Sequence, residues 1–208
     1  MTNKSETSLL GQPAALLLIG FQNDYFSPTG ALYNALEDKA GVDNALRNSL
    51  RLIETLRPTR TPIISTPISF KPGYPEIAEP VGILRTIKEV GAFQSGQPGS
   101  EIIPEHAAFG DRIRIVTGRH GLNAFAETEL GDALYQAGVK HVIIAGVVTS
   151  LCVDSTARSA IEHGYPVTVV ADAVCGRTAY ENDFYLKSVF PMYARVVSTD
   201  ELLANTSA

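Results

Sequence analysis

Short apolar runs alternate along the chain with longer segments in which apolar residues recur every three or four positions. Six short runs are expected to be strands: 14–21, 61–68, 111–116, 140–148, 165–172 and 194–199. Most of them are nearly continuous in apolar residues, as strands buried on both faces must be. Four segments between them have helical spacing: 42–57, 126–138, 152–164 and 181–193. This alternation predicts an α/β fold, a three-layer doubly wound parallel sheet of about six strands with helices on both faces.

The long segment 70–110 interrupts this alternation. It is rich in proline and glycine and has little periodicity, so we expect a functional loop or lid that carries a short helix. No repeat or linker divides the 208 residues, and we expect a single domain over 1–208. Residues 1–12 are polar and lack the apolar core of a secretory signal, so they are expected to form a flexible leader.

Composition and charge narrow the possible partners. A net charge of −5 offers no basic surface for nucleic acid, and the apolar runs are shorter than the roughly 18 residues that span a bilayer. Two cysteines, Cys152 and Cys175, do not form a disulfide framework, which favours a cytoplasmic protein. The histidines lack metal-ligand spacing and no phosphate-binding glycine motif occurs, so we expect a small-molecule substrate and neither metal nor cofactor.

Cys152 is the residue whose position best fits chemistry. A strand ends near Gly146, a tight turn follows, and Cys152 is expected to open the helix of 152–164. The positive end of a helix favours a thiolate, and its unpaired N–H groups can stabilise an oxyanion. Position alone leaves this interpretation level with a buried core cysteine, and for Cys175 the core interpretation is the stronger.

Three segments together resemble the isochorismatase-like cysteine hydrolases. AGVVTSLCVDSTARSAIEHGYPVTVVADA, which contains Cys152, is similar to the nucleophile motif of that superfamily. LLLIGFQNDYF at 16–26 resembles its first-strand motif, and EIIPEHAAFGDRIRIVTGRHGLNAF at 101–125 resembles its central motif. The resemblance implies hydrolysis of a small amide or other C–N substrate, with Cys152 as nucleophile, in a homodimer or homotetramer.

Two positions of the usual Asp, Lys and Cys triad differ in this chain. The resemblance puts Gly20 at the aspartate position, two residues before Gln22, and Arg119 at the lysine position, six before Phe125. Glycine cannot transfer protons, whereas arginine stays protonated and can stabilise an anion. Asp24, just past the first strand, is the candidate substitute for acid–base work, although capping a turn is the commoner role for an aspartate there.

The resemblance also implies features around these residues. A cis peptide is expected between Val147 and Val148, with the backbone amides of Val148 and Cys152 forming the oxyanion hole. Phe26 and Phe125, which lie within the motifs, are expected to contact the substrate. The metal site of nicotinamidases is not expected, because STPISFKPGYPEI at 65–77 contains neither aspartate nor histidine.

Two functions therefore remain open. The first is a cysteine hydrolase with an atypical triad of Cys152, Arg119 and Asp24. The second is a non-catalytic or repurposed ligand-binding member that has lost the triad, which the glycine at position 20 favours. Hydrolysis of an enol ether, as by isochorismatase itself, ranks below both because it still needs the missing aspartate.

Overall fold

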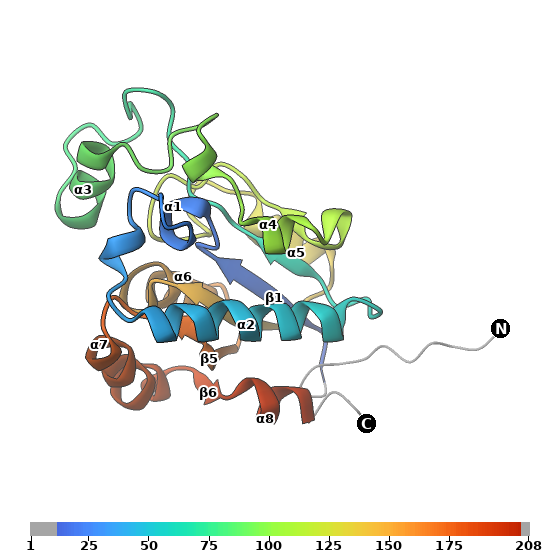
Figure 1. Ribbon diagram of the computed structural model, residues 1–208. Coiled ribbons are helices and arrows are strands. Elements are labelled where there is room, and N and C mark those ends of the chain that lie inside the picture. Colours follow the sequence, from blue (N-terminus) through green and yellow to red (C-terminus); the bar gives the residue numbers. More distant parts are fainter. Residues whose placement is uncertain (1–11, 205–208) are drawn as a thin grey trace.

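Six parallel strands form one sheet in the order β3-β2-β1-β4-β5-β6 in the computed structural model, which describes residues 12–204 (Figure 1). They are β1 (Ala14–Ile19), β2 (Ile63–Ser65), β3 (Arg114–Ile115), β4 (His141–Val147), β5 (Val167–Cys175) and β6 (Arg195–Val197). The chain winds outward from β1 to β3 and then returns to place β4 on the other side of β1. The predicted doubly wound sheet is confirmed, and its topological switch point lies between β1 and β4.

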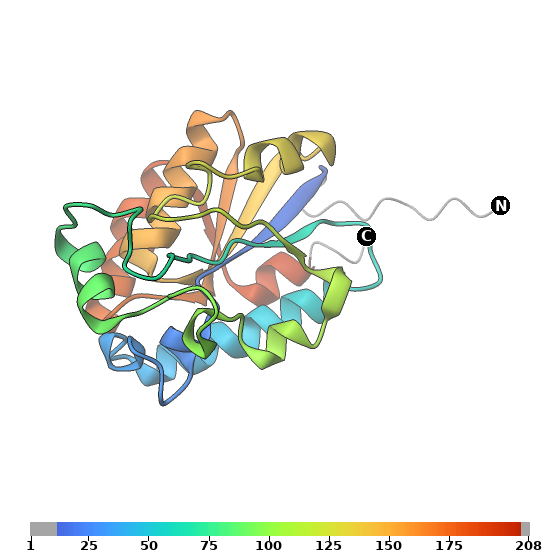
Figure 2. The ribbon, with the colours of Figure 1, turned by 90° about the horizontal axis from the view of Figure 1, so that it is seen from above.

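Helices cover both faces of this sheet. The α-helices are α1 (Asn23–Phe26), α2 (Lys39–Leu56), α3 (Gly82–Val90), α4 (Pro104–Ala107), α5 (Leu130–Gln136), α6 (Asp154–Glu162), α7 (Ala179–Phe184) and α8 (Thr199–Ala204). Viewed from above, α2, α4 and α8 lie on one side of the sheet, and α5 and α6 lie on the other (Figure 2). None of the helices within residues 12–204 is long and apolar enough to cross a membrane.

The central strand β1 shows how the sequence fixes the two faces. All six of its residues are buried, and alternate residues point to opposite sides. Leu16 and Leu18 pack with apolar residues of α2 and α8, while Leu17 and Ile19 pack with those of α5 and α6. Each fully buried side chain of this kind contributes about 1.5–3 kcal/mol, which holds the end of β1 in place.

The element boundaries differ from the sequence prediction where local capping intervenes. The predicted helix of 42–57 begins earlier, at Lys39, because the Asp38 side chain caps it by accepting a 2.9 Å hydrogen bond from the Gly41 N–H. The predicted helix of 181–193 divides into α7, a π-helical turn (Tyr185–Val189) and a 3₁₀ turn (Phe190–Met192). Of the predicted leader, only Gln12 lies within the described residues.

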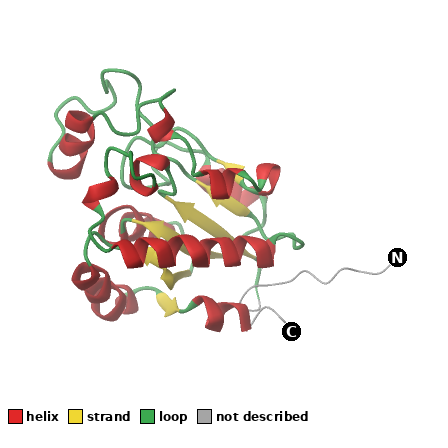
Figure 3. Cartoon of the chain, in the orientation of Figure 1, coloured by secondary structure: helices red, strands yellow, loops and turns green. Residues whose placement is uncertain are grey.

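The proline- and glycine-rich segment 70–110 contains more helix than its pattern suggested. It holds α3, α4 and a 3₁₀ turn at Pro98–Ser100, joined by loops that lie above the carboxyl end of β1 (Figure 3). Gly91 ends α3 in the left-handed conformation at φ 71°, which a glycine adopts without strain. These loops form one wall of the region described below.

A buried histidine ties α4 to α2. His106 is 1% exposed, its Nε2 lies 2.8 Å from the Ser49 hydroxyl, and its ring lies 4.4 Å from that of Phe21. Burial lowers the pKa of His106 to about 3, because the charged imidazolium would lose its hydration. His141, at the start of β4, has a pKa lowered for the same reason and by the nearby Arg195.

His106 should make the fold less stable in acid. Its folded-state pKa lies below the unfolded value of about 6.5, so protons bind preferentially to the unfolded chain as the pH falls. Between pH 7.5 and pH 5, we expect this residue to remove about 2 kcal/mol from the free energy of unfolding. Urea unfolding should show that His106→Gln loses this part of the pH dependence, while the control His163→Gln, at an exposed histidine, keeps it. Equal pH dependence in wild type and His106→Gln would contradict the assignment.

Candidate functional site

The carboxyl ends of β1 and β4 meet at the switch point, and Gly20 lies in this contact. Gly20 has φ 72°, and a Cβ placed on it would lie 2.5 Å from the Val147 carbonyl oxygen. Residues other than glycine are strained at this φ, and the Val147 carbonyl oxygen occupies the space that a side chain would need. The position where the resemblance puts an aspartate is therefore closed by the backbone of β4.

Cys152 lies on the turn that follows β4. The Val147–Val148 peptide is cis, and a π-helical turn (Thr149–Val153) comes next, with the Val148 carbonyl accepting from the Leu151 and Val153 amides at 3.0 and 3.2 Å. The expectation that Cys152 opens the following helix is wrong by two residues, because α6 begins at Asp154. Cys152 is 4% exposed. The oxyanion hole of the Val148 and Cys152 amides stays a prediction.

Arg119 is fully buried and held by backbone carbonyls. Its Nε, Nη1 and Nη2 donate to the carbonyl oxygens of Gly121, Thr66 and Leu122 at 2.8, 3.0 and 2.9 Å. Within residues 12–204, no carboxylate oxygen lies within 4 Å of its guanidinium. A guanidinium has five N–H donors, so two remain for an anion. A bridge between Ile68 and Arg119 places this residue beyond the ends of β2 and β3.

Asp24 is engaged in tying two loops together. Its carboxylate accepts from the Ala31 N–H at 3.0 Å and from the Phe93 N–H at 2.5 Å. The loop of Gly99 also packs directly on this carboxylate, where a Cβ would lie 2.2 Å from one of its oxygens. No hydrogen bond joins Asp24 to Cys152 in the part of the chain that the structure describes. The structure thus shows the turn-forming role, and the acid–base role stays a prediction.

Gln22 connects β1 to the loops around this region. Its side-chain amide donates to the Ile68 carbonyl at 2.8 Å and to the Ser100 carbonyl at 2.7 Å, and its oxygen accepts from the Ile68 N–H at 2.9 Å. Gln22 is 1% exposed, so these bonds are shielded from water. They fix the start of α1 relative to the segment after β2, in which Ile68 pairs with Arg119.

Tyr25 is a functional candidate that the sequence analysis missed. It is 3% exposed, its ring packs on Phe93 at 5.1 Å, and it shares a buried cluster with Val148. Burial raises the pKa of Tyr25, the Cys152 charge raises it further, and Arg119 lowers it, so this phenol lies within electrostatic range of both groups. The signal was present in the sequence, because Tyr25 puts a hydroxyl within the LLLIGFQNDYF motif, directly after Asp24.

Of the two predicted substrate contacts, Phe125 lies in the core and Phe26 is partly buried against it. Phe26 stacks on Phe21 at 5.2 Å, and Phe125 stacks on His163 at 4.7 Å. His163 follows the C-terminal end of the nine-residue α6, about 14 Å from the end nearest Cys152. The structure therefore does not bring Phe125 to the sulfur, and substrate contact by these two rings stays a prediction.

Cys175, the second cysteine, is fully buried at the end of β5. Its sulfur lies 3.1 Å from the Gly176 carbonyl oxygen. Burial, together with the nearby Asp38 and Glu181, raises the pKa of the Cys175 thiol to about 12. This cysteine is a protonated core residue at neutral pH, unlike the nucleophile expected at Cys152.

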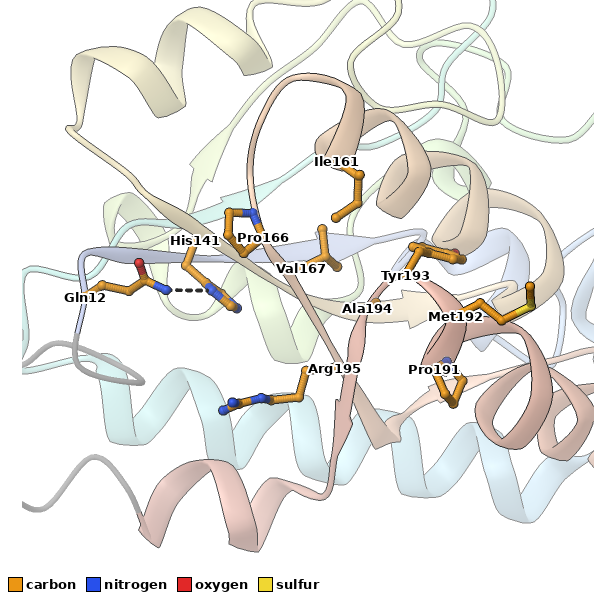
Figure 4. A pocket seen from close by; sticks show the side chains of 10 residues that line it. All are labelled: Gln12, His141, Ile161, Pro166, Val167, Pro191, Met192, Tyr193, Ala194 and Arg195. Atoms are coloured by element: carbon orange, nitrogen blue, oxygen red, sulfur yellow. Dashed lines mark hydrogen bonds between the residues drawn. The ribbon is translucent and has the colours of Figure 1, made fainter.

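A cavity of about 600 Å³ lies at the opposite, amino-terminal edge of the sheet (Figure 4). His141 and Arg195 line it where β4 and β6 begin, and His141 is bound to Gln12 at 3.0 Å and to Thr168 at 2.8 Å. Residues 12–204 hold no group of three histidine, cysteine, aspartate or glutamate side chains suited to a metal ion. The chemical groups that could act together are those at the switch point.

Comparison with known proteins agrees with this geometry. The chain is 27% identical over 198 residues to the maleamate amidohydrolase of Pseudomonas putida, covering 93% of this chain and 86% of that protein. N-carbamoylsarcosine amidase from Thermoplasma acidophilum has a TM-score of 0.70 at 25% identity, covering 90% and 96% of the two chains. An isochorismatase-like hydrolase from Alkaliphilus metalliredigens has the same fold, with a TM-score of 0.73 at 22% identity over 92% and 97%.

A sequence model of the isochorismatase domain matches residues 14–201, from the first residue of β1 into α8. This match covers nearly the whole of the described sheet and both helical layers. The protein therefore belongs to the isochorismatase domain family.

Proposed function

We propose that the protein hydrolyses a small amide that carries an anionic group, with Cys152 as nucleophile. The observation that carries the proposal is a buried cysteine between β4 and α6, at the switch point of a family whose relatives include amidohydrolases. The anionic group is proposed from the buried, uncompensated charge of Arg119. Two similar proteins, a maleamate amidohydrolase and an N-carbamoylsarcosine amidase, are named for substrates that carry a carboxylate.

The proposed reaction proceeds through a thioester. The Cys152 thiolate attacks the amide carbonyl carbon, and the amides of Val148 and Cys152 donate to the oxyanion that forms. The C–N bond then breaks, the amine leaves with a proton, and water hydrolyses the thioester to release the acid. In this scheme Asp24 holds the walls of the site, because both of its oxygens already accept backbone N–H groups.

The environment of Arg119 supports an anionic ligand. A buried charge is costly unless it is paired, and carbonyl dipoles compensate it only in part. Its two remaining N–H donors can bind a carboxylate or an oxyanion with charge-assisted hydrogen bonds.

We also propose that the protein is a homodimer or homotetramer, as the resemblance implies, and that it is cytoplasmic, as the cysteine content favours.

The alternative of a non-catalytic binding protein rests on Gly20. Loss of the aspartate would leave a site that binds an anionic molecule without cleaving it. The two functions differ in a simple way, because only the hydrolase releases amine from an amide. Ammonia release from a panel of small amides therefore separates them.

The nucleophile is tested by Cys152→Ala. We expect the release of amine from any substrate of the wild type to fall by at least about 10³-fold, because no other thiolate is available. Cys175→Ala is the matched control and should retain activity within about twofold, since its thiol is fully buried and stays protonated because burial raises its pKa to about 12. Comparable activity in Cys152→Ala and wild type would rule out the proposed mechanism.

Arg119 is tested with maleamate and maleamide, which differ only in that a carboxylate replaces a carboxamide. Arg119→Gln should lower kcat/KM for maleamate at least about tenfold more than for maleamide, because a charge-assisted hydrogen bond is lost only with the acid. Arg112→Gln is the control, because Arg112 also donates to backbone carbonyls, including those of Leu56 and Thr61. An unchanged ratio in Arg119→Gln would contradict recognition of the carboxylate.

Gly20 is tested by introducing a side chain. Gly20→Ala should lower the free energy of unfolding by about 1–3 kcal/mol more than Gly73→Ala, because both have positive φ but only Gly20 faces a carbonyl oxygen. Gly20→Asp should suffer at least as much and gain no activity. A Gly20→Asp variant with wild-type stability and higher turnover would show that the carboxylate can still be accommodated.

A further inference from the structure

The hydroxyl of Tyr25 has no hydrogen-bond partner among the described residues. The side chain is 3% exposed, and within residues 12–204 its oxygen makes no hydrogen bond to another residue. The oxygen is also not among the fully buried unpaired side-chain atoms of these residues, which are Thr66 Oγ1 and His106 Nδ1, so it remains accessible to a ligand. Tyr74 provides a contrast, since it is 5% exposed and its hydroxyl donates to the Ala92 carbonyl at 2.9 Å.

The position of Tyr25 is fixed by hydrogen bonds of the residues that precede it and by the ring on which it packs. Gln22, which precedes α1, makes three hydrogen bonds to Ile68 and Ser100, and the neighbouring Asp24 binds the Phe93 amide. The Tyr25 ring then packs against Phe93 at an interplanar angle of 56°. These contacts hold the hydroxyl without binding it, as a group that acts on a substrate requires.

Tyr25 also lies between the two ends of the proposed site. It follows β1, the central strand, while Cys152 follows β4 on one side and Arg119 lies beyond β2 and β3 on the other. It belongs to the same buried cluster as Val147 and Val148, which lead to the Cys152 turn. The phenol therefore follows the same strand as Gly20 and packs in the cluster that contains Val147 and Val148.

We infer that the Tyr25 hydroxyl donates the proton to the leaving nitrogen, the step for which Gly20 has no carboxylate. This inference rests on the proposed function and names a residue for its unassigned proton transfer. When the C–N bond breaks, the Tyr25 O–H proton passes to the nitrogen, which leaves as neutral amine, and a Cys152 thioester and a Tyr25 phenolate remain. Water then attacks the thioester carbon, its proton returns to the phenolate, and the acid and the Cys152 thiolate are regenerated.

The charges around Tyr25 change in the direction that this step needs. Burial and the Cys152 charge both raise the pKa of Tyr25, so the phenol keeps its proton while the thiolate is free. Formation of the thioester removes the Cys152 charge, whereas the Arg119 guanidinium, which lowers this pKa, stays in place. Formation of the thioester thus removes one of the charges that oppose the phenolate, while burial and the Asp24 charge still raise the pKa of Tyr25.

Asp24 is the rival donor, and its contacts oppose that role. Its two carboxylate oxygens accept hydrogen bonds from the amides of Ala31 and Phe93, so both are engaged in joining the loops. Protonation would also remove an acceptor that joins two loops. Tyr25 needs no such rearrangement, because its hydroxyl has no protein partner to lose.

The test compares Tyr25→Phe with wild type on maleamate and on the p-nitrophenyl ester of acetate. Nitrophenolate leaves the ester as an anion, whereas the amide nitrogen must receive a proton before it can leave. Loss of a proton donor should therefore slow hydrolysis of the amide and not of the ester. We expect kcat/KM for the amide to fall by about 10²-fold or more and the rate of nitrophenol release to change by less than about threefold. Because the hydroxyl has no partner, Tyr25→Phe should unfold at the same urea concentration as wild type.

Tyr74→Phe is the matched control, since it loses a hydroxyl with a known structural bond. It should be less stable than wild type but keep the wild-type ratio of amide to ester hydrolysis. Equal losses on amide and ester in Tyr25→Phe, or no loss on either, would overturn the inference while Cys152→Ala still abolished turnover. Failure of the proposed function has a different signature, because Cys152→Ala would then match wild type on both substrates.

Discussion

The backbones of β1 and β4 approach so closely at the switch point that the Val147 carbonyl oxygen fills the space beside Gly20. This contact depends on a residue without a side chain and on the register in which Ile19 pairs with Gly146. It closes the first strand to chemistry, although the strand still aligns everything that follows it. The end of β1 sets the positions of Gln22 and Tyr25. The proposed nucleophile, Cys152, follows β4, and the proposed anion-binding residue, Arg119, lies beyond β2 and β3.

The buried guanidinium of Arg119 is the second constraint on the chemistry of this region. Three backbone carbonyls bind it, and these belong to the segment after β2 and to the turn that follows Arg119 itself. The carbonyls orient the planar fork, so two N–H donors have fixed directions instead of the mobility of a lysine. Such a group is suited to holding an anion in one place and unsuited to moving a proton. Proton transfer must therefore be separate from anion binding, which is why an unbound phenol between Arg119 and Cys152 matters.

Much of the fold could be predicted from the sequence, because continuous apolar runs fix buried parallel strands regardless of the partners they find. The departures at Gly20 and Arg119 could also be predicted from the sequence, because these residues differ from the aspartate and lysine of the usual triad. The contacts of Asp24 could not be predicted, since the Phe93 amide that it binds is 69 residues away and lies in a segment without periodicity. Phe125 illustrates the same limit, because its motif position gave no sign that its ring would stack on His163.

The burial of Arg119 and Tyr25 supports a polar ligand, whether the protein is a hydrolase or a binding protein. The position of Cys152 distinguishes these two functions. The side chains of Arg119 and Tyr25 are almost completely excluded from water, and each has an N–H or O–H group that no described residue binds. A bound anionic amide could accept hydrogen bonds from both. A binding protein would need nothing more than this pair. The added feature is Cys152, on a turn that leads into the amino end of α6. The proposed hydrolase uses this sulfur to attack the amide, whereas a protein that only binds its ligand needs no nucleophile at this position.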